Sequence, residues 1–142
     1  MLSKKTQYAL QALAYMVEHQ DATPILIAEI ADKKNIPIKF LENILLELKK
    51  AGFLDSKKGK HGGYLFAIPP SKIKLSGIFR IIEGPIAMLP CVSLNFYQKC
   101  ADCNEKKCSI NKVLIEVRDN TLAVLDKRTV ADLFLKKLNP SK

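Results

Sequence analysis

Apolar residues recur every three or four positions along most of this chain, which predicts a mainly helical protein. In the first third of the chain this period predicts three helices, at residues 6–19, 26–36 and 38–52. The third has the clearest pattern, because its apolar residues lie at i, i+3, i+4 and i+7: Leu41, Ile44, Leu45 and Leu48. Its polar residues fall on the opposite face, which on an isolated helix would simply contact solvent.

The helical period stops at residue 53, where a hairpin pattern begins. The stretch FLDSKKGKHGGYLFAI (53–68) has short apolar ends around a middle rich in glycine and lysine. Gly59, Gly62 and Gly63 allow the positive φ angles of a tight turn, so the stretch predicts two antiparallel strands. Two short helices, a turn and a basic hairpin together predict a winged helix-turn-helix. In that fold a recognition helix enters the major groove, and the hairpin, or wing, contacts a neighbouring backbone or minor groove.

The second half of the chain predicts three further helices. The stretch LSGIFRIIEGP predicts a short helix with Ser76 as its N-cap and Gly84-Pro85 as its stop. A long helix at 110–128 follows, and a short one, capped by Thr129, ends the chain. The long helix has one apolar stripe: Ile110, Val113, Leu114, Val117, Thr121, Val124 and Leu125. Such stripes more often belong to a core, but this one follows a complete domain, so we expect a second copy to bury it in a homodimer.

These elements divide the chain into three parts. We expect a winged helix-turn-helix domain at 1–84, a cysteine-rich sensor loop at 85–109, and a dimerisation helix with a C-terminal helix at 110–142. The fold class is therefore mainly α, with a small β-hairpin wing. At 142 residues the chain is long enough for one domain with a small appendage.

Charge and hydropathy narrow the partners and the location. The net charge of +9 is spread over both halves, but residues 49–60 hold five lysines and one acid. Charge alone makes nucleic acid only one candidate partner, because a charged run is usually a solvated face. No apolar run approaches the roughly 18 residues of a membrane span. The basic and apolar N-terminus follows a helical period rather than that of a signal peptide, so we expect a cytoplasmic protein.

All four cysteines lie within residues 91–108, with the spacing C-x8-C-x2-C-x4-C. In a reducing compartment such a cluster is more typical of metal binding or redox chemistry than of disulfides. Zinc and iron–sulfur clusters both bind thiolates, and the irregular spacing favours iron–sulfur over zinc. Free or oxidised thiols without metal remain the alternative. Nearby lysines, Lys99, Lys106 and Lys107, would favour thiolates and suit metal binding or an oxidation-sensitive switch equally.

Several segments in this order resemble the Rrf-two family of bacterial transcription regulators. They are IPIKFLENILLELKKAGFL (36–54), SKKGKHGGY (56–64), the cysteine segment before a long helix, and TVADL (129–133). The resemblance implies a dimeric winged-helix repressor or activator that, in some members, senses through a [2Fe–2S] or [4Fe–4S] cluster. Such members use three cysteines and one further ligand.

The resemblance also implies which residues hold the cluster. Cys91 and Cys108 match the outer cysteines of the family pattern, and Cys100 or Cys103 matches the middle one. The family's further ligand is a histidine or an N-terminal acid, whereas this chain has Asn111 and Gln7 at the matching positions. Neither is a good iron ligand, so the additional cysteine could complete an all-thiolate site.

For contacts with double-stranded DNA we expect two groups of residues. Glu42 and Asn43 are candidates for reading base edges, since glutamate suits cytosine and asparagine suits adenine; by resemblance, Glu42 also matches a glutamate that discriminates between site classes. Lys39 and Thr6 are candidates for the backbone. The wing supplies Lys57, Lys58, Lys60 and His61, and by resemblance Lys58 enters the minor groove. Two recognition helices about 34 Å apart would face a near-palindromic operator.

Other function classes fit less well. With two distant histidines and no grouped carboxylates, we find no set of residues for hydrolysis or acid–base catalysis, and we expect no enzyme. An iron–sulfur carrier or electron-transfer module would explain the cysteines but not the lysine-rich hairpin. A repressor of the same fold that is regulated by thiols or a protein partner, without a cluster, would explain both.

Overall fold

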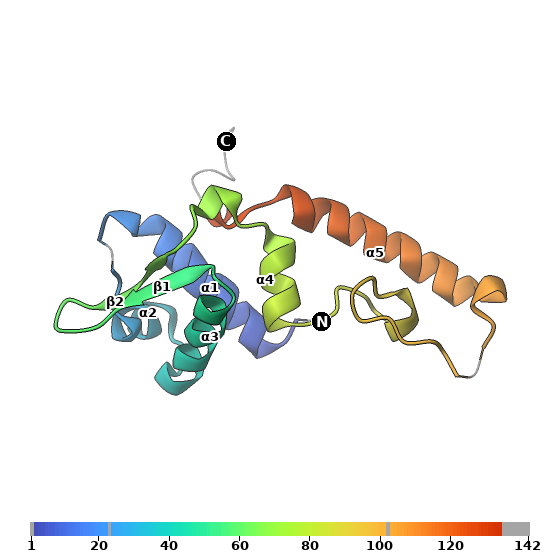
Figure 1. Cartoon of the computed structure of the whole chain (residues 1–142), viewed down its shortest axis with the longest axis horizontal. Coiled ribbons are helices and arrows are strands. Elements are labelled where there is room, and N and C mark those ends of the chain that lie inside the picture. Colours follow the sequence, from blue (N-terminus) through green and yellow to red (C-terminus); the bar gives the residue numbers. More distant parts are fainter. Residues whose placement is uncertain (1, 23, 102, 135–142) are drawn as a thin grey trace.

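The computed structural model describes residues 2–22, 24–101 and 103–134 (Figure 1). Its α-helices are α1 (Lys4–Glu18), α2 (Ile27–Lys34), α3 (Ile38–Lys50), α4 (Leu75–Ile82) and α5 (Ser109–Lys127). Its strands are β1 (Leu54–Lys57) and β2 (Gly63–Phe66). Single 3₁₀ turns lie at Gln20–Ala22, Pro70–Lys72, Pro90–Val92, Glu105–Lys107 and Val130–Leu133. The prediction of a mainly helical protein with a small β-hairpin is confirmed.

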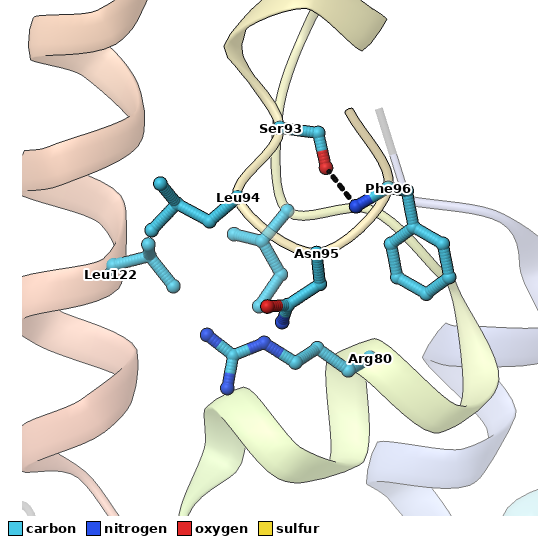
Figure 2. A pocket seen from close by; sticks show the side chains of 7 residues that line it. Arg80, Ser93, Leu94, Asn95, Phe96 and Leu122 are labelled. Atoms are coloured by element: carbon cyan, nitrogen blue, oxygen red, sulfur yellow. Dashed lines mark hydrogen bonds between the residues drawn. The ribbon is translucent and has the colours of Figure 1, made fainter. Parts of the chain in front are cut away.

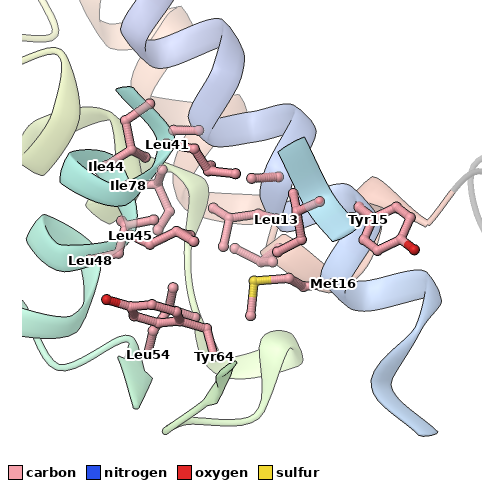
Figure 3. Close-up of a cluster of buried hydrophobic side chains, with 14 of the residues drawn as sticks. Leu13, Tyr15, Met16, Leu41, Ile44, Leu45, Leu48, Leu54, Tyr64 and Ile78 are labelled. Carbon is pink, nitrogen blue, oxygen red and sulfur yellow. The ribbon is translucent and has the colours of Figure 1, made fainter. Parts of the chain in front are cut away.

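Helices α1 to α4 pack around one apolar core (Figure 3). The predicted stripe of α3 forms its centre, since Leu41, Leu45 and Leu48 are fully buried and meet Leu13 and Met16 of α1. Burying one such side chain stabilises a fold by about 1.5–3 kcal/mol. The apolar period of α3 therefore orients this helix, with one face in the core and the other outside.

The hairpin pairs β1 with β2 in antiparallel register, from Leu54 opposite Phe66 to Lys57 opposite Gly63. The segment before α2 joins its other edge, because Ile25 and Tyr64 exchange two backbone hydrogen bonds of 2.8 Å each. Gly63 has a φ of +147°, and a Cβ built there would lie 2.2 Å from the Ile25 carbonyl oxygen. This position accepts only glycine, which fixes where the wing meets the helices.

The start of α4 differs from the prediction. The N-cap is Lys74 rather than Ser76, and Ser76 lies inside the helix and is buried. The reason is a long-range contact: Lys74 forms a β-bridge with Thr129, and the Leu75 N–H donates to the Arg128 carbonyl at 3.0 Å. Backbone from the far end of the chain therefore satisfies the helix start, and no side-chain cap is needed.

Helix α5 extends away from the helical body and carries the cysteine segment beside its far end (Figure 1). The chain then returns to the body, where the Val130 N–H donates to the Ile73 carbonyl at 2.9 Å. Thr129 caps the last turn, as predicted, with its N–H donating to Asp132 at 2.8 Å. The last helix, predicted over TVADLFLKKL (129–138), is a 3₁₀ turn at Val130–Leu133, and residues 135–138 of that prediction lie outside the described residues.

Candidate nucleic-acid interface and cysteine loop

The outer face of α3 carries the residues predicted to read DNA. Lys39 and Asn43 are exposed, and Glu42 is half-buried, with its carboxylate 3.5 Å from the Lys39 ammonium. Leu46 lies on the same face and is 41% exposed. The four residues form one continuous surface because they lie opposite the buried stripe of the helix.

The wing is held against this face of α3. Lys49 donates to the Ser56 hydroxyl of β1 at 2.7 Å. Burial, and after it the negative charge of Glu42, raise the pKa of Tyr64 on β2, which places Glu42 near the wing. The recognition helix and the hairpin thus form one surface rather than two independent parts.

The predicted basic residues of the wing are exposed. Lys57, Lys58, Lys60 and His61 lie around the turn that joins the two strands. In the part of the chain that the structure describes, the salt bridges join Lys5 to Glu47, Lys39 to Glu42 and Arg118 to Asp119, so none involves the wing. Three ammonium groups are therefore available to a polyanion.

Thr6 is placed differently from the other predicted contacts. It is fully buried, and its hydroxyl donates to the carboxylate of Glu83. Ser3 also donates to Glu83, through its hydroxyl at 2.6 Å and its N–H at 3.3 Å. The hydrogen bonds from Ser3 and then Thr6 lower the pKa of Glu83. The predicted contact of Thr6 with DNA stays untested, but in this structure its side chain joins α1 to the end of α4.

Sequence reasoning missed Lys5, which belongs to the same surface as Asn43. Its ammonium lies 2.7 Å from Glu47 of α3. A hollow of about 430 Å³ is lined by Lys5, Phe40, Asn43, Glu47 and Lys50, among others. The signal was weak: Ser3 marks an N-cap and hence an earlier helix start, but nothing local indicates that Lys5 faces α3.

Residues 93–96, in the first part of the cysteine loop (85–109), lie between α4 and α5 (Figure 2). The Ser93 hydroxyl accepts the Phe96 N–H at 3.0 Å, and Leu94 lies beside Leu122 of α5. Arg118 of α5 donates to the Val92 carbonyl at 2.7 Å. The first part of the loop is therefore fixed to the helix that follows it.

The sulfur atoms gather around the start of α5. Cys108 is the N-cap of that helix, and its sulfur accepts the Asn111 N–H at 3.4 Å. The side-chain amide of Asn111 donates to Cys91, also at 3.4 Å. A hydrogen bond with Cys100, with smaller contributions from burial and from Cys108, raises the pKa of Cys103 to about 12. All four predicted ligands thus lie in one neighbourhood.

A second network shapes the loop between the sulfurs. The Tyr97 hydroxyl donates to both carboxylate oxygens of Glu105, at 2.8 and 3.0 Å, and the Cys100 N–H donates to the same carboxylate at 3.4 Å. These bonds tie Tyr97 and the backbone of Cys100 to Glu105, within the part of the loop that holds the two middle cysteines.

The donor set fits an iron–sulfur cluster in its chemistry, because thiolates are the usual ligands of such clusters. Within residues 2–22, 24–101 and 103–134, however, no three or more His, Cys, Asp or Glu side chains are arranged so that they could hold a metal ion. The sulfurs are neighbours but are not closed around a common centre.

Helix α5 leaves most of its predicted stripe uncovered. Ile110, Val113, Val117 and Val124 are 62%, 58%, 39% and 58% exposed, and Leu114 and Leu125 are half-buried. The face packed against the cysteine loop and α4 is a different one, marked by Asn111, Arg118 and Leu122. Among the described residues, no helix is both long and apolar enough to cross a membrane.

The helical body, the exposed face of α3 and the adjoining basic hairpin define a winged-helix protein, a class whose transcription regulators bind DNA. The family model of Rrf2, described as "Iron-dependent Transcriptional regulator", matches residues 2–136. The chain belongs to this Rrf2 family and is a transcription regulator, as the resemblance implied.

Individual relatives agree. The chain is 42% identical to an rrf2-like HTH-type transcriptional regulator of Rhodobacter capsulatus, over 94% of this chain and 92% of the relative. Among solved structures it is similar to CymR, titled the global cysteine regulator of B. subtilis, with a TM-score of 0.77, 28% identity and coverage of 94% and 95%. It is also similar to T. potens IscR, with a TM-score of 0.72, 29% identity and coverage of 97% and 88%.

Proposed function

We propose that this chain is a homodimeric DNA-binding regulator whose cysteine loop holds an iron–sulfur cluster, [2Fe–2S] or [4Fe–4S], as its sensor. The observation that carries the DNA-binding part is the outer face of α3, which presents Lys39, Glu42 and Asn43 beside the three exposed lysines of the wing. Glu42 and Asn43 read base edges, and Lys39 contacts the backbone.

The wing contributes affinity rather than sequence reading. Lys57, Lys58 and Lys60 each neutralise a phosphate, and His61 lies at the tip of the same turn. The slope of log K against log salt is negative, and each lost phosphate contact makes it shallower by about 0.9. This part of the surface therefore gives the interaction its dependence on salt.

The dimer forms through the exposed stripe of α5. Valine and isoleucine at Ile110, Val113, Val117 and Val124 leave an apolar surface on a helix that extends beyond the body. A second copy of the same helix offers a matching surface, and two copies present two reading faces to a near-palindromic operator.

Cys91, Cys100, Cys103 and Cys108 would hold the cluster, which, when bound, supplies sensitivity to oxidants, nitric oxide or iron–sulfur status. The residues of the chain link this loop to the dimer helix, because Cys108 is both the last thiol and the N-cap of α5. Ordering of the loop therefore changes the start of α5 and, through the dimer, the spacing of the two reading faces.

A second candidate is a regulator of the same fold that responds through its thiols without a cluster. One observation favours it: the described residues have no group arranged to hold a metal ion. The two candidates separate in the visible spectrum of protein purified without oxygen. Charge-transfer bands support the cluster, whereas a colourless protein that still loses DNA affinity on thiol oxidation supports the second candidate.

The DNA-binding part is tested by replacing Lys57, Lys58 and Lys60 with alanine and measuring binding of a duplex selected from a randomised pool by fluorescence anisotropy. Over a salt series we expect the negative slope of log K against log salt to become shallower by about 2.7, since three contacts at about 0.9 each are lost. The matched control replaces Lys99, Lys106 and Lys107, which removes the same charge from the cysteine loop. Equal slopes for the two triple variants would contradict the proposal.

Base reading has a separate signature. Asn43→Ala and Glu42→Ala should each weaken binding to the selected duplex by about 1–3 kcal/mol and relax the preference at one base pair, while the salt slope stays unchanged. A uniform loss over all sequences would assign these residues to the backbone instead.

A further inference from the structure

Asn111 is a buried polar residue at the point where the cysteine loop becomes α5. Asn111 is only 6% exposed, and it lies in the first turn of α5. Its backbone N–H donates to the sulfur of Cys108, and its side-chain amide donates to the sulfur of Cys91, both at 3.4 Å. One residue therefore joins two thiols that are 17 positions apart in the sequence.

The chemistry of the amide makes Asn111 a donor rather than a ligand. An uncharged amide is a poor ligand for iron where thiolates are available, whereas its N–H is a good donor to sulfur, which accepts more strongly as a thiolate than as a thiol. The geometry agrees, because the amide nitrogen of Asn111 lies 3.4 Å from the Cys91 sulfur and donates to it.

The position is also suited to this role. The third residue of a helix has a backbone N–H without an intrahelical partner, and here that N–H is the one donated to Cys108. A short side chain at this position reaches the neighbouring Pro90–Val92 turn, which holds Cys91. The backbone N–H and the side-chain amide of Asn111 thus each donate to a sulfur.

We propose that Asn111 is a positioning residue that sets the electron density on the sulfurs of Cys91 and Cys108 when these thiolates bind a cluster or a thiophilic metal. The inference rests on the proposed role of the cysteine loop as a metal site. Hydrogen bonds to the ligating sulfurs withdraw electron density, stabilise the reduced cluster and raise its reduction potential. Four thiolates then ligate, and Asn111 adjusts how easily the site is oxidised.

The test compares Asn111→Ala and Asn111→Asp with wild type after anaerobic reconstitution with ferrous iron and sulfide. Both variants remove the amide donor to Cys91 and keep the backbone donor to Cys108. The aspartate variant guards against misfolding, because an acid in the first turn of a helix is favourable. We expect wild-type iron content and a lower potential, by about a tenfold change in the one-electron equilibrium, which is about 59 mV.

The matched control is Asn104→Ala. Asn104 lies in the same loop and accepts the Lys106 N–H at 3.1 Å, so its loss removes one loop hydrogen bond without removing a donor to sulfur. Its potential should equal that of wild type. An unchanged potential in both Asn111 variants, or an equal shift in the control, overturns the proposal. If both Asn111 variants lose the cluster and the control keeps it, Asn111 would be a ligand, which also overturns the proposal.

A second measurement separates this inference from the proposed cluster. Metal-free protein is titrated with Co²⁺, whose sulfur-to-metal absorption bands should move to lower energy in Asn111→Ala, because the sulfur lone pairs lose a hydrogen bond. If wild type assembles no iron–sulfur cluster but the Co²⁺ bands shift in Asn111→Ala, the proposed cluster is refuted and the role of Asn111 is supported. If wild type binds neither iron–sulfur nor Co²⁺, both the cluster and the role of Asn111 are overturned. DNA binding is tested separately by the wing variants.

Discussion

Replacing Gly63 with alanine should loosen the wing from the helical body. The new Cβ would lie 2.2 Å from the Ile25 carbonyl oxygen and 2.5 Å from its carbon, so the backbone must move. Moving it breaks the two 2.8 Å hydrogen bonds between Ile25 and Tyr64, at about 1 kcal/mol each. An alanine at a φ of +147° adds about 1 kcal/mol of strain, which gives a loss of about 3 kcal/mol.

Urea unfolding and thermal melting measure this loss, which should lower Tm by roughly 10 °C. Hydrogen exchange should show faster exchange of the Ile25 and Tyr64 amides, and DNA affinity should fall because the wing is no longer held beside α3. The control is Gly59→Ala, which has a φ of +107° but no atom within 4 Å of the added Cβ, so it costs only the strain of about 1 kcal/mol. A Gly63→Ala protein as stable as the Gly59→Ala protein would refute the reasoning.

Three further predictions concern stability and assembly. Glu83→Gln should lower the free energy of unfolding at pH 7, and the difference from wild type should vanish in acid. A carboxyl with a lowered pKa stabilises the fold above its ordinary pKa of 4.5 and ceases to do so as pH falls through the lowered value. Urea titrations at several pH values measure the difference, and one that stays constant with pH would contradict the prediction. The double variant Val113→Lys with Val117→Lys should be monomeric by light scattering, whereas Ala123→Lys, on the exposed opposite side of α5, should remain dimeric; equal masses would exclude the stripe as the interface. Leu45→Ala, at a fully buried position, should cost about 2–5 kcal/mol in urea unfolding, and a loss below 1 kcal/mol would place Leu45 outside the core.

The parts of the fold that depend on local pattern were predictable from the sequence. The apolar residues of α3 are spaced so that only one face can be buried, and the structure buries Leu41, Ile44, Leu45 and Leu48. Glycines and lysines between two short apolar runs were enough to predict the hairpin and its exposed lysines. In both cases neighbours in the sequence determine the geometry.

The parts that depend on distant backbone were not predictable. Ser76 has the residue type of an N-cap, but a bridge from Lys74 to Thr129 sets the start of α4 instead. Thr6 lies on a helix near the presumed DNA surface, but Glu83, 77 residues later, takes its hydroxyl. Nothing near either residue in the sequence signals these contacts, because each arises only when the chain has folded.

The cysteines lie between these two cases. Their clustering in the sequence indicated a shared neighbourhood, and the structure brings their sulfurs together around the start of α5. The part played by Asn111 was not predictable, since the sequence identifies it only as the wrong residue for a ligand. Its bond to Cys91 depends on the fold that brings the Pro90–Val92 turn beside the start of α5.

The position of Cys108 as N-cap has a mechanical consequence for any covalent change at its sulfur. Alkylation, nitrosylation or a mixed disulfide would put a bulky substituent on the sulfur that now accepts the Asn111 N–H and would exclude a thiolate there, so the first turn of α5 would lose its N-cap. Helix α5 would then fray from its N-terminal end towards Val113 and become shorter by about 5 Å for each turn lost. A covalent change at the Cys108 sulfur would thereby change the length of helix α5.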